Sequence, residues 1–447
     1  MKKRIDFLKR SLVRDILAGL TVSFAALSLG AAFGVMSGRG AFAGMLAAAV
    51  IPIITSLFGG TRLQASGPTA PMTSVSAILI AFAYDQFHGD PRLAEQYITL
   101  VLLLSSVFIA LTGIFRLGRF ITKVPQVVVL GFMNGIAVII WKDQLIKLFA
   151  LHHQEPLLGG IGLNSLIAFG VLLTIYAIPF LLQRAGLPLS IRRFIPAIFV
   201  TIVAFTAFTT FFNLPVAHVS LGKTVGSLGE FGQMVLNFWP SDPRLYTGEM
   251  LLHAVPLALQ LCVLAYLDSL LTSLIIDKMT REKTKHDREL LAQGLANGVV
   301  AILQGIPGAQ ATIRSVLLLK EGAQSRMAGV FVGLFTLAGF LVFGKLMVLI
   351  ASSVFIGVLF KAGLDVFDRD FPLAFFRYGW IRQRTRNIQL FFIAYTTIIT
   401  VLVDLNVAVL TGTVFFYLAQ HFLGAVDVEG DFSEVHSEEL LGTSVEG

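Results

Sequence analysis

Cysteine and charged residues are scarce in this chain. One cysteine, Cys262, occurs among 447 residues, and only 14% of the residues are charged. A single thiol cannot form an intramolecular disulfide framework or a thiolate metal cluster. Soluble globular domains carry about 25% charged residues, so the low charge content excludes an ordinary soluble domain.

Apolar residues make up 55% of the chain, and the mean hydropathy is +0.80. Apolar runs close to the length of a bilayer-spanning helix recur from end to end. The short alternating segments of a transmembrane barrel are not seen. We therefore predict an all-α polytopic membrane protein, with the lipid bilayer as its surroundings.

One short motif occurs twice. The sequence GPTAPMTSV at residues 67–75 is matched by GAQATIRSV at residues 308–316. Each copy opens with residues suited to irregular backbone and continues as a helix, and Pro71 suits a first helical turn. Helix N-termini inside a membrane carry partial positive charge and form anion sites near the midplane of transporters. The motif predicts two half-helices, near residues 71–84 and 311–320.

The apolar runs group into 14 predicted segments, with the half-helices as segments 3 and 10. The predicted organisation is a basic lead-in, a first seven-segment repeat, an extracellular connection, a second seven-segment repeat and an acidic tail, at residues 1–14, 15–212, 213–248, 249–422 and 423–447. An odd number of segments per repeat reverses the second copy, which makes an inverted repeat. Gly30 permits a break in the first segment, near residues 16–34. An interfacial helix is expected within residues 364–386.

The basic residues indicate topology. Four basic loops and the N-terminus fall on one side of the 14-segment arrangement, and the positive-inside rule makes that side cytoplasmic. We expect a plasma (inner) membrane protein with both termini in the cytoplasm. The net charge of +7 is explained by these loops and does not indicate binding to nucleic acid.

Two ionisable residues lie deep in predicted segments, where each costs about 2.5–3.5 kcal/mol to insert. Asp268 shares a helix face with Gln260 and Thr272, which lie eight residues before it and four after it. A carboxylate with a hydroxyl suits part of a Na⁺ shell, or a proton carrier. Arg314 lies one turn into the second half-helix and adds to its positive field. The alternative is that Asp268 and Arg314 form only a buried structural ion pair.

Other polar residues near the half-helices can surround an anion, namely Thr69, Thr73, Gln310, Thr312 and Ser315. Capping of the half-helices is the alternative role for each, and backbone N–H groups are expected to matter more. Phe33 either lines the site or packs. No credible nucleophile or metal arrangement is found, so an enzyme is the least expected class and no cofactor is expected.

These motifs resemble the sulfate permease (SulP) family of inorganic anion transporters. The resemblance covers residues 12–422 and includes GFMNGIAVIIWKDQL at 131–145 and RELLAQGLAN at 288–297. It implies 14 segments in two inverted repeats, a core and a gate domain, a homodimer and an elevator-like movement of the core. It also implies a substrate site formed by segments 1, 3, 8 and 10.

The run DSLLT at 268–272 looks most like the Na⁺-dependent bicarbonate transporters of cyanobacteria within that family, whose matching Asp and Thr bind Na⁺. We expect Na⁺ at Asp268, Thr272 and Gly308. We expect the anion at Phe33, Thr69, Ala70, Ala311, Thr312 and Arg314. The chain departs from the family at Ser28-Leu29, where Pro-Gln is frequent. Most members continue into a cytoplasmic STAS domain, whereas this sequence stops after an acidic stretch at 427–447; either that domain has been removed or this is a member that dispenses with it.

The leading hypothesis is a secondary transporter that moves a small inorganic anion together with Na⁺. The alternatives are a proton-coupled permease for sulfate or a dicarboxylate, with Asp268 as the proton carrier, and an anion channel or voltage-responsive motor. A related fold carries nucleobases, but Arg314 favours a full negative charge. Bicarbonate, sulfate, nitrate and small carboxylates all fit two helix ends and one arginine.

Overall fold

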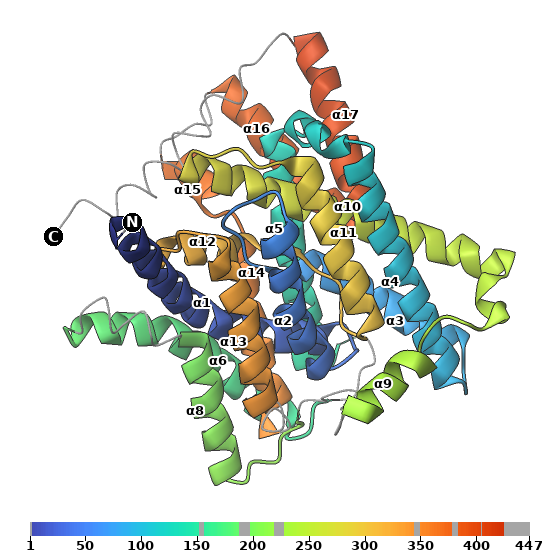
Figure 1. Ribbon diagram of the computed structural model, residues 1–447, viewed down its shortest axis with the longest axis vertical. Coiled ribbons are helices and arrows are strands. Elements are labelled where there is room, and N and C mark those ends of the chain that lie inside the picture. Colours follow the sequence, from blue (N-terminus) through green and yellow to red (C-terminus); the bar gives the residue numbers. More distant parts are fainter. Residues whose placement is uncertain are drawn as a thin grey trace. The chain divides into compact units, whose positions relative to one another are not determined.

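The computed structural model describes residues 2–151, 156–186, 197–218, 228–343, 349–377, 383–403 and 405–423. Within these ranges the chain is mostly helical (Figure 1). Six of the described helices are long and apolar enough to cross a membrane, and four shorter apolar helices accompany them. The predicted helical membrane fold is therefore confirmed.

The chain divides into two compact units, Met1–Arg119 with Lys147–Val358 and Phe120–Ile146 with Leu359–Gly447. The first unit holds both copies of the repeated motif. Its elements in chain order are α1 (Lys2–Met36), α2 (Ala41–Phe58), β1 (Ser66–Gly67), α3 (Ala70–Gln86), α4 (Pro91–Ile114), α6 (Gly160–Arg184), α8 (Ala197–Phe211), α9 (Leu228–Asn237), η2 (Pro243–Tyr246), α10 (Gly248–Thr280), α11 (His286–Ile302), β2 (Ala309–Gln310), α12 (Thr312–Lys320) and α13 (Met327–Phe343).

The second unit begins within η1 (Leu117–Lys123) and includes most of α5 (Gln126–Leu148) and the end of α14 (Ser352–Val366). It continues with α15 (Asp370–Arg377), α16 (Arg384–Leu402) and α17 (Leu405–Leu423). The motif at 131–145 lies on α5. A Cβ on Gly135 would lie 2.4 Å from the Cβ of Thr400, so this glycine lets α5 and α16 approach closely.

The first helix differs from its prediction. α1 runs without interruption to Met36, so the break expected at Gly30 is wrong. A Cβ on Gly30 would lie 2.7 Å from the Cβ of Ala48, and one on Gly44 would lie 1.9 Å from the carbonyl oxygen of Gly30. Small residues let membrane helices pack backbone to backbone. Gly30 therefore serves the contact between α1 and α2.

The two predicted half-helices, near residues 71–84 and 311–320, agree with α3 and α12 to within two residues. Helix α4 begins at Pro91, where the Asp90 carboxylate accepts a hydrogen bond from the N–H of Leu93 (3.0 Å) and caps the helix. The range 364–386, where an interfacial helix is expected, contains the end of α14, all of α15 and the start of α16. Residues 378–382 and the predicted acidic tail from 424 onward lie outside the described residues.

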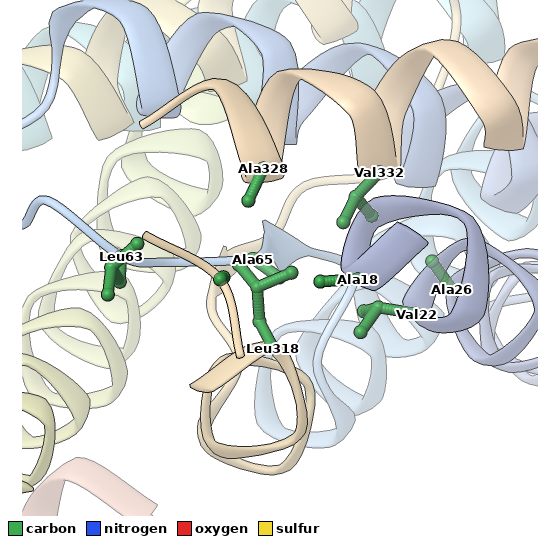
Figure 2. Close-up of a cluster of buried hydrophobic side chains, with 9 residues drawn as sticks. Ala18, Val22, Ala26, Leu63, Ala65, Leu318, Ala328 and Val332 are labelled. Atoms are coloured by element: carbon green, nitrogen blue, oxygen red, sulfur yellow. The ribbon is translucent and has the colours of Figure 1, made fainter. Parts of the chain in front are cut away.

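A buried apolar cluster supports the segments that carry the repeated motif (Figure 2). Its members come from α1, from the stretch before β1, and from α12, α13 and the turn between them: Ala18, Val22, Ala26, Leu63, Ala65, Leu318, Ala323, Ala328 and Val332. Figure 2 shows the α12 side chain Leu318 lying against Ala65. The cluster therefore anchors α12 and the approach to β1 on the same helices.

Candidate functional site

The two copies of the motif meet in space. Strand β1 pairs antiparallel with β2, with Ser66 opposite Gln310 and Gly67 opposite Ala309. Helix α3 begins at Ala70 and α12 begins at Thr312, each a few residues after its strand. The short ladder therefore brings two helix N-termini together from distant parts of the sequence.

Two glycines permit this contact. Gly67 has φ +151, and a Cβ there would lie 2.7 Å from Nη1 of Arg314. A Cβ on Gly308 would lie 2.3 Å from the carbonyl carbon of Gly67. No side chain fits at either position without moving backbone or the guanidinium, so both glycines are required by the close approach of the two segments.

Both helix starts lack side-chain caps. Thr69 is the N-cap residue of α3 and Ala311 that of α12, and neither makes a side-chain cap hydrogen bond. Among the described residues, no hydrogen bond uses the N–H groups of Ala70 or Thr312. Unpaired N–H groups at a helix start carry partial positive charge. The two starts thus offer donors suited to an anion.

Arg314 supplies a whole positive charge one turn into α12. Its side chain is 2% exposed, and its Nη2 donates to the carbonyl oxygen of Pro68 at 2.8 Å. Its Nη1 has no hydrogen-bond partner among the described residues. No ion pair within the described chain joins Arg314 to Asp268, so the structural-pair alternative finds no support.

Asp268 lies on α10 and contacts the start of α3. It is 8% exposed, and its Oδ2 accepts a hydrogen bond from the Thr69 hydroxyl at 2.8 Å. The capping role considered for Thr69 is therefore wrong, because its side chain donates to another helix.

Thr272, one turn along α10, contacts the other helix start. Its hydroxyl donates to the carbonyl oxygen of Gln310 at 3.1 Å and lies 2.6 Å from the Thr312 hydroxyl. One face of α10 therefore reaches α3 through Asp268 and α12 through Thr272, as the four-residue spacing predicts. Gln260, two turns before Asp268, is half-buried.

The contacts of the remaining predicted site residues say less about a binding role. Ala311 donates its N–H to the carbonyl oxygen of Ala65 at 3.4 Å. The Gly308 carbonyl accepts from Nδ2 of Asn297 at 2.9 Å, so one acceptor direction of this proposed Na⁺ ligand is already used. Phe33 is buried on α1. None of the hydrogen bonds or ring contacts among the described residues links the Phe33 side chain to the two helix starts.

Sequence reasoning missed a buried polar row on α11. Oε2 of Glu289 accepts from the N–H groups of Gly60 (2.8 Å) and Thr61 (2.9 Å). Gln293 donates to the Ser66 hydroxyl at 2.9 Å, and Asn297 bonds Gly308 through both its amide atoms. The four-residue spacing of Glu289, Gln293 and Asn297 was a usable signal. This row fixes the backbone on both sides of the ladder.

A polydentate metal site is not found in the part of the chain that the structure describes, since no group of three or more His, Cys, Asp and Glu side chains gathers there. One carboxylate with neutral oxygens remains, as at Asp268 and Thr272. Such a set suits a weakly held monovalent cation better than Zn²⁺ or Ca²⁺, which take more ligands or softer ones.

A model of the sulfate permease family matches residues 12–375. The chain is 31% identical over 424 residues to the bicarbonate transporter BicA of Picosynechococcus sp., covering 90% of this chain and 69% of that protein. It is 27% identical over 409 residues to the putative sulfate transporter YvdB of Bacillus subtilis, covering 89% of this chain and 72% of that protein.

Solved structures agree. The transmembrane domain of a cyanobacterial BicA matches with a TM-score of 0.73 at 26% identity, covering 90% of this chain and 98% of that one. SLC26A9 matches with a TM-score of 0.70 at 16% identity, covering 93% and 66%, and shares the fold. The multi-pass helical fold, the repeated motif and the family match together show that this chain belongs to the sulfate permease family of anion transporters.

Proposed function

We propose that the protein is a secondary active transporter that carries a small inorganic anion of the bicarbonate or sulfate class by Na⁺ symport. One observation supports this most directly. Two helix starts without side-chain caps are joined by the β1–β2 ladder, beside a buried Arg314 whose Nη1 has no partner among the described residues. Unpaired donors and one full charge, shielded from water, favour an anion over a neutral solute.

Na⁺ is assigned to Asp268, Thr272 and the backbone near Gly308. The Asp268 carboxylate has one described hydrogen bond, from the neutral Thr69 hydroxyl. A buried carboxylate needs a cationic partner or a proton. Bound Na⁺ would be the cationic partner. The two anion classes are taken from the names of the relatives, the bicarbonate transporter BicA and the putative sulfate transporter YvdB.

The transport cycle is assigned to an elevator-type movement of a core that carries both helix starts, within a homodimer. Both starts, Asp268 and Arg314 lie in the same compact unit, which supports moving them together. The arrangement in two inverted seven-segment repeats, and a plasma membrane location with cytoplasmic termini, complete this proposal.

A proton-coupled permease is the second candidate, favoured by the same lack of a described cationic partner at Asp268. Uptake of labelled bicarbonate and of labelled sulfate into proteoliposomes separates the two. Na⁺ symport requires that an inward Na⁺ gradient drives saturable uptake at fixed pH, and that K⁺ does not replace Na⁺. Uptake driven by inward proton gradients without Na⁺ supports the second candidate. Ionic current without saturation contradicts both.

A further inference from the structure

A cavity of about 220 Å³ lies apart from the paired helix starts, within the first unit. It lies between the loop that follows α2, the end of α10, the start of α11 and the turn before α13. Its lining residues are Gly60, Thr61, Arg62, Leu63, Ile276, Asp277, Thr280, Glu282, Lys283, Thr284, Lys285, Arg288 and Arg326. We call it the basic pocket. Its apolar wall is shared with the core, since Leu63 also belongs to the cluster in Figure 2.

The basic pocket carries an excess of positive charge. Five of its lining side chains are basic, and two are acidic. Both acidic side chains are already engaged. Glu282 pairs with Arg62 at 2.7 Å, and Asp277 accepts both the N–H and the hydroxyl of Thr284, at 2.8 and 2.7 Å.

Two guanidinium groups are held in place by neutral carbonyls. Nε of Arg288 donates to Phe58 O at 2.8 Å, and Nη1 of Arg326 donates to Gly59 O at 2.7 Å. Carbonyl oxygens orient these groups without cancelling their charge. Burial, and next the repulsion from the neighbouring Arg288, lower the pKa of Arg326. Glu289, on the other side of Gly60, offsets this only in part.

The wall of the basic pocket is connected to the paired strands. The hydroxyl oxygens of Thr284 and Thr61 lie 3.1 Å apart, and the Thr61 hydroxyl lies 3.0 Å from that of Ser273. Ser273 in turn donates to Oε1 of Gln310, in β2, at 2.8 Å. A ligand that fixes the loop at Thr61 therefore also stabilises β2 through this chain of polar contacts.

We propose that the basic pocket is a second anion site, which binds a phosphate-class oxyanion and stabilises the loop at residues 60–62. The guanidinium groups of Arg288 and Arg326 can donate paired hydrogen bonds to the oxygens of a multivalent oxyanion. The ammonium groups of Lys283 and Lys285 add positive charge and do not require one fixed geometry. The phosphate can be inorganic phosphate or that of an anionic lipid headgroup. This site is independent of the transported anion.

The test measures thermal unfolding of the full-length purified protein in detergent, titrated with inorganic phosphate at constant pH and ionic strength. Phosphate is expected to raise the melting temperature. Lys283→Gln/Lys285→Gln, both exposed side chains, should raise the half-saturating phosphate concentration about tenfold or more, as for a lost charged contact. Arg326→Gln should do the same if it folds. Lys142→Gln, an exposed lysine in the other unit, is the matched control and should behave as wild type.

Nanodiscs distinguish the two sources of phosphate. Stabilisation by free phosphate in phosphatidylcholine discs assigns a soluble ligand. Stabilisation by phosphatidylglycerol alone, lost in Lys283→Gln/Lys285→Gln, assigns a headgroup. The proposal is overturned if neither stabilises, or if the pocket variants respond as wild type does. It is also overturned if Arg314→Ala, rather than the pocket variants, removes the effect, because phosphate would then bind at the transport site.

Discussion

The two helix starts have the same backbone plan and different chemistry. The start of α3 carries Pro71, which has no N–H, and a Thr69 hydroxyl that donates to Asp268. The start of α12 carries Arg314 and a Thr312 hydroxyl beside Thr272. The positive charge of α12 is in turn held by the Pro68 carbonyl that precedes α3. Duplication thus provides the geometry, and divergence places the contact with the Asp268 carboxylate at α3 and the buried positive charge at α12.

The largest expected effect comes from removing the shared geometry. Gly308→Ala places a Cβ 2.3 Å from Gly67 backbone, so β1 and β2 must separate. We expect a loss of about 3 kcal/mol in the free energy of unfolding and uptake reduced to background. Thermal unfolding in detergent and proteoliposome uptake measure this. Gly232→Ala, where a Cβ meets open space, is the matched control, and an active Gly308→Ala protein would refute the requirement for contact.

Removing the charge of α12 tests the anion side. Arg314→Ala should weaken anion binding roughly 10- to 100-fold, the range expected for a charged hydrogen bond. Arg314→Lys keeps the charge but loses the planar fork. If the lysine variant keeps transport, the positive charge of residue 314 is what matters most. If it loses as much transport as the alanine variant, the guanidinium binds the anion directly through paired hydrogen bonds. Unchanged anion affinity in a folded Arg314→Ala protein would remove this residue from the site.

A structural role for the same arginine makes a different prediction. Arg314→Ala would then misfold, and Asp268→Asn combined with it would restore stability. Melting temperatures of the two single variants and the double variant decide between these roles.

Neutralising Asp268 of α10 tests the proposed cation site. Asp268→Asn preserves size and can still accept the Thr69 hydrogen bond, but lacks the charge that attracts Na⁺. We expect Na⁺-driven uptake to be abolished with the melting temperature close to that of wild type. Initial rates as a function of Na⁺ concentration provide the measurement. Uptake with wild-type Na⁺ dependence would show that the assignment is wrong.

The smallest effect should distinguish the two hydroxyls. Thr272→Val deletes one neutral oxygen from the proposed Na⁺ shell and should raise the half-saturating Na⁺ concentration about three- to tenfold. Thr69→Val instead removes the described partner of Asp268. If Na⁺-driven uptake requires the hydrogen bond that holds Asp268 at the start of α3, both variants should raise the half-saturating Na⁺ concentration. A shift with Thr69→Val alone would place Thr272 outside the cation site.

The sequence predicted the structure best at positions where a residue type has only one common structural role. Pro71 and the repeated glycines predicted both helix starts to within a residue, and the spacing of Asp268 and Thr272 predicted a shared face. Glycine misled at Gly30, because a glycine that permits a break also permits close helix packing, and sequence does not show which neighbour approaches. The capping role of Thr69 was likewise excluded only by the position of α10, whose Asp268 accepts the Thr69 hydroxyl.

Buried charges with partners far along the chain were the hardest to foresee. Glu95 lies near the start of α4, and its Oε2 lies 2.9 Å from Nη2 of Arg39, with both residues buried. Glu289 is fully buried and bonded to backbone N–H groups more than 200 residues away. Such partners follow from tertiary packing, and a polar residue near a predicted helix end gives no local sign of them.

The ladder between β1 and β2 has a mechanical consequence. With Ser66 opposite Gln310, Gly67 opposite Ala309 and Arg314 bonded across to Pro68 O, α3 and α12 cannot swing apart without breaking buried hydrogen bonds. A movement that separates α3 from α12 would break the β1–β2 ladder that holds their N-termini together. In the proposed transport cycle, we therefore expect α3 and α12 to stay joined and to move together relative to their surroundings.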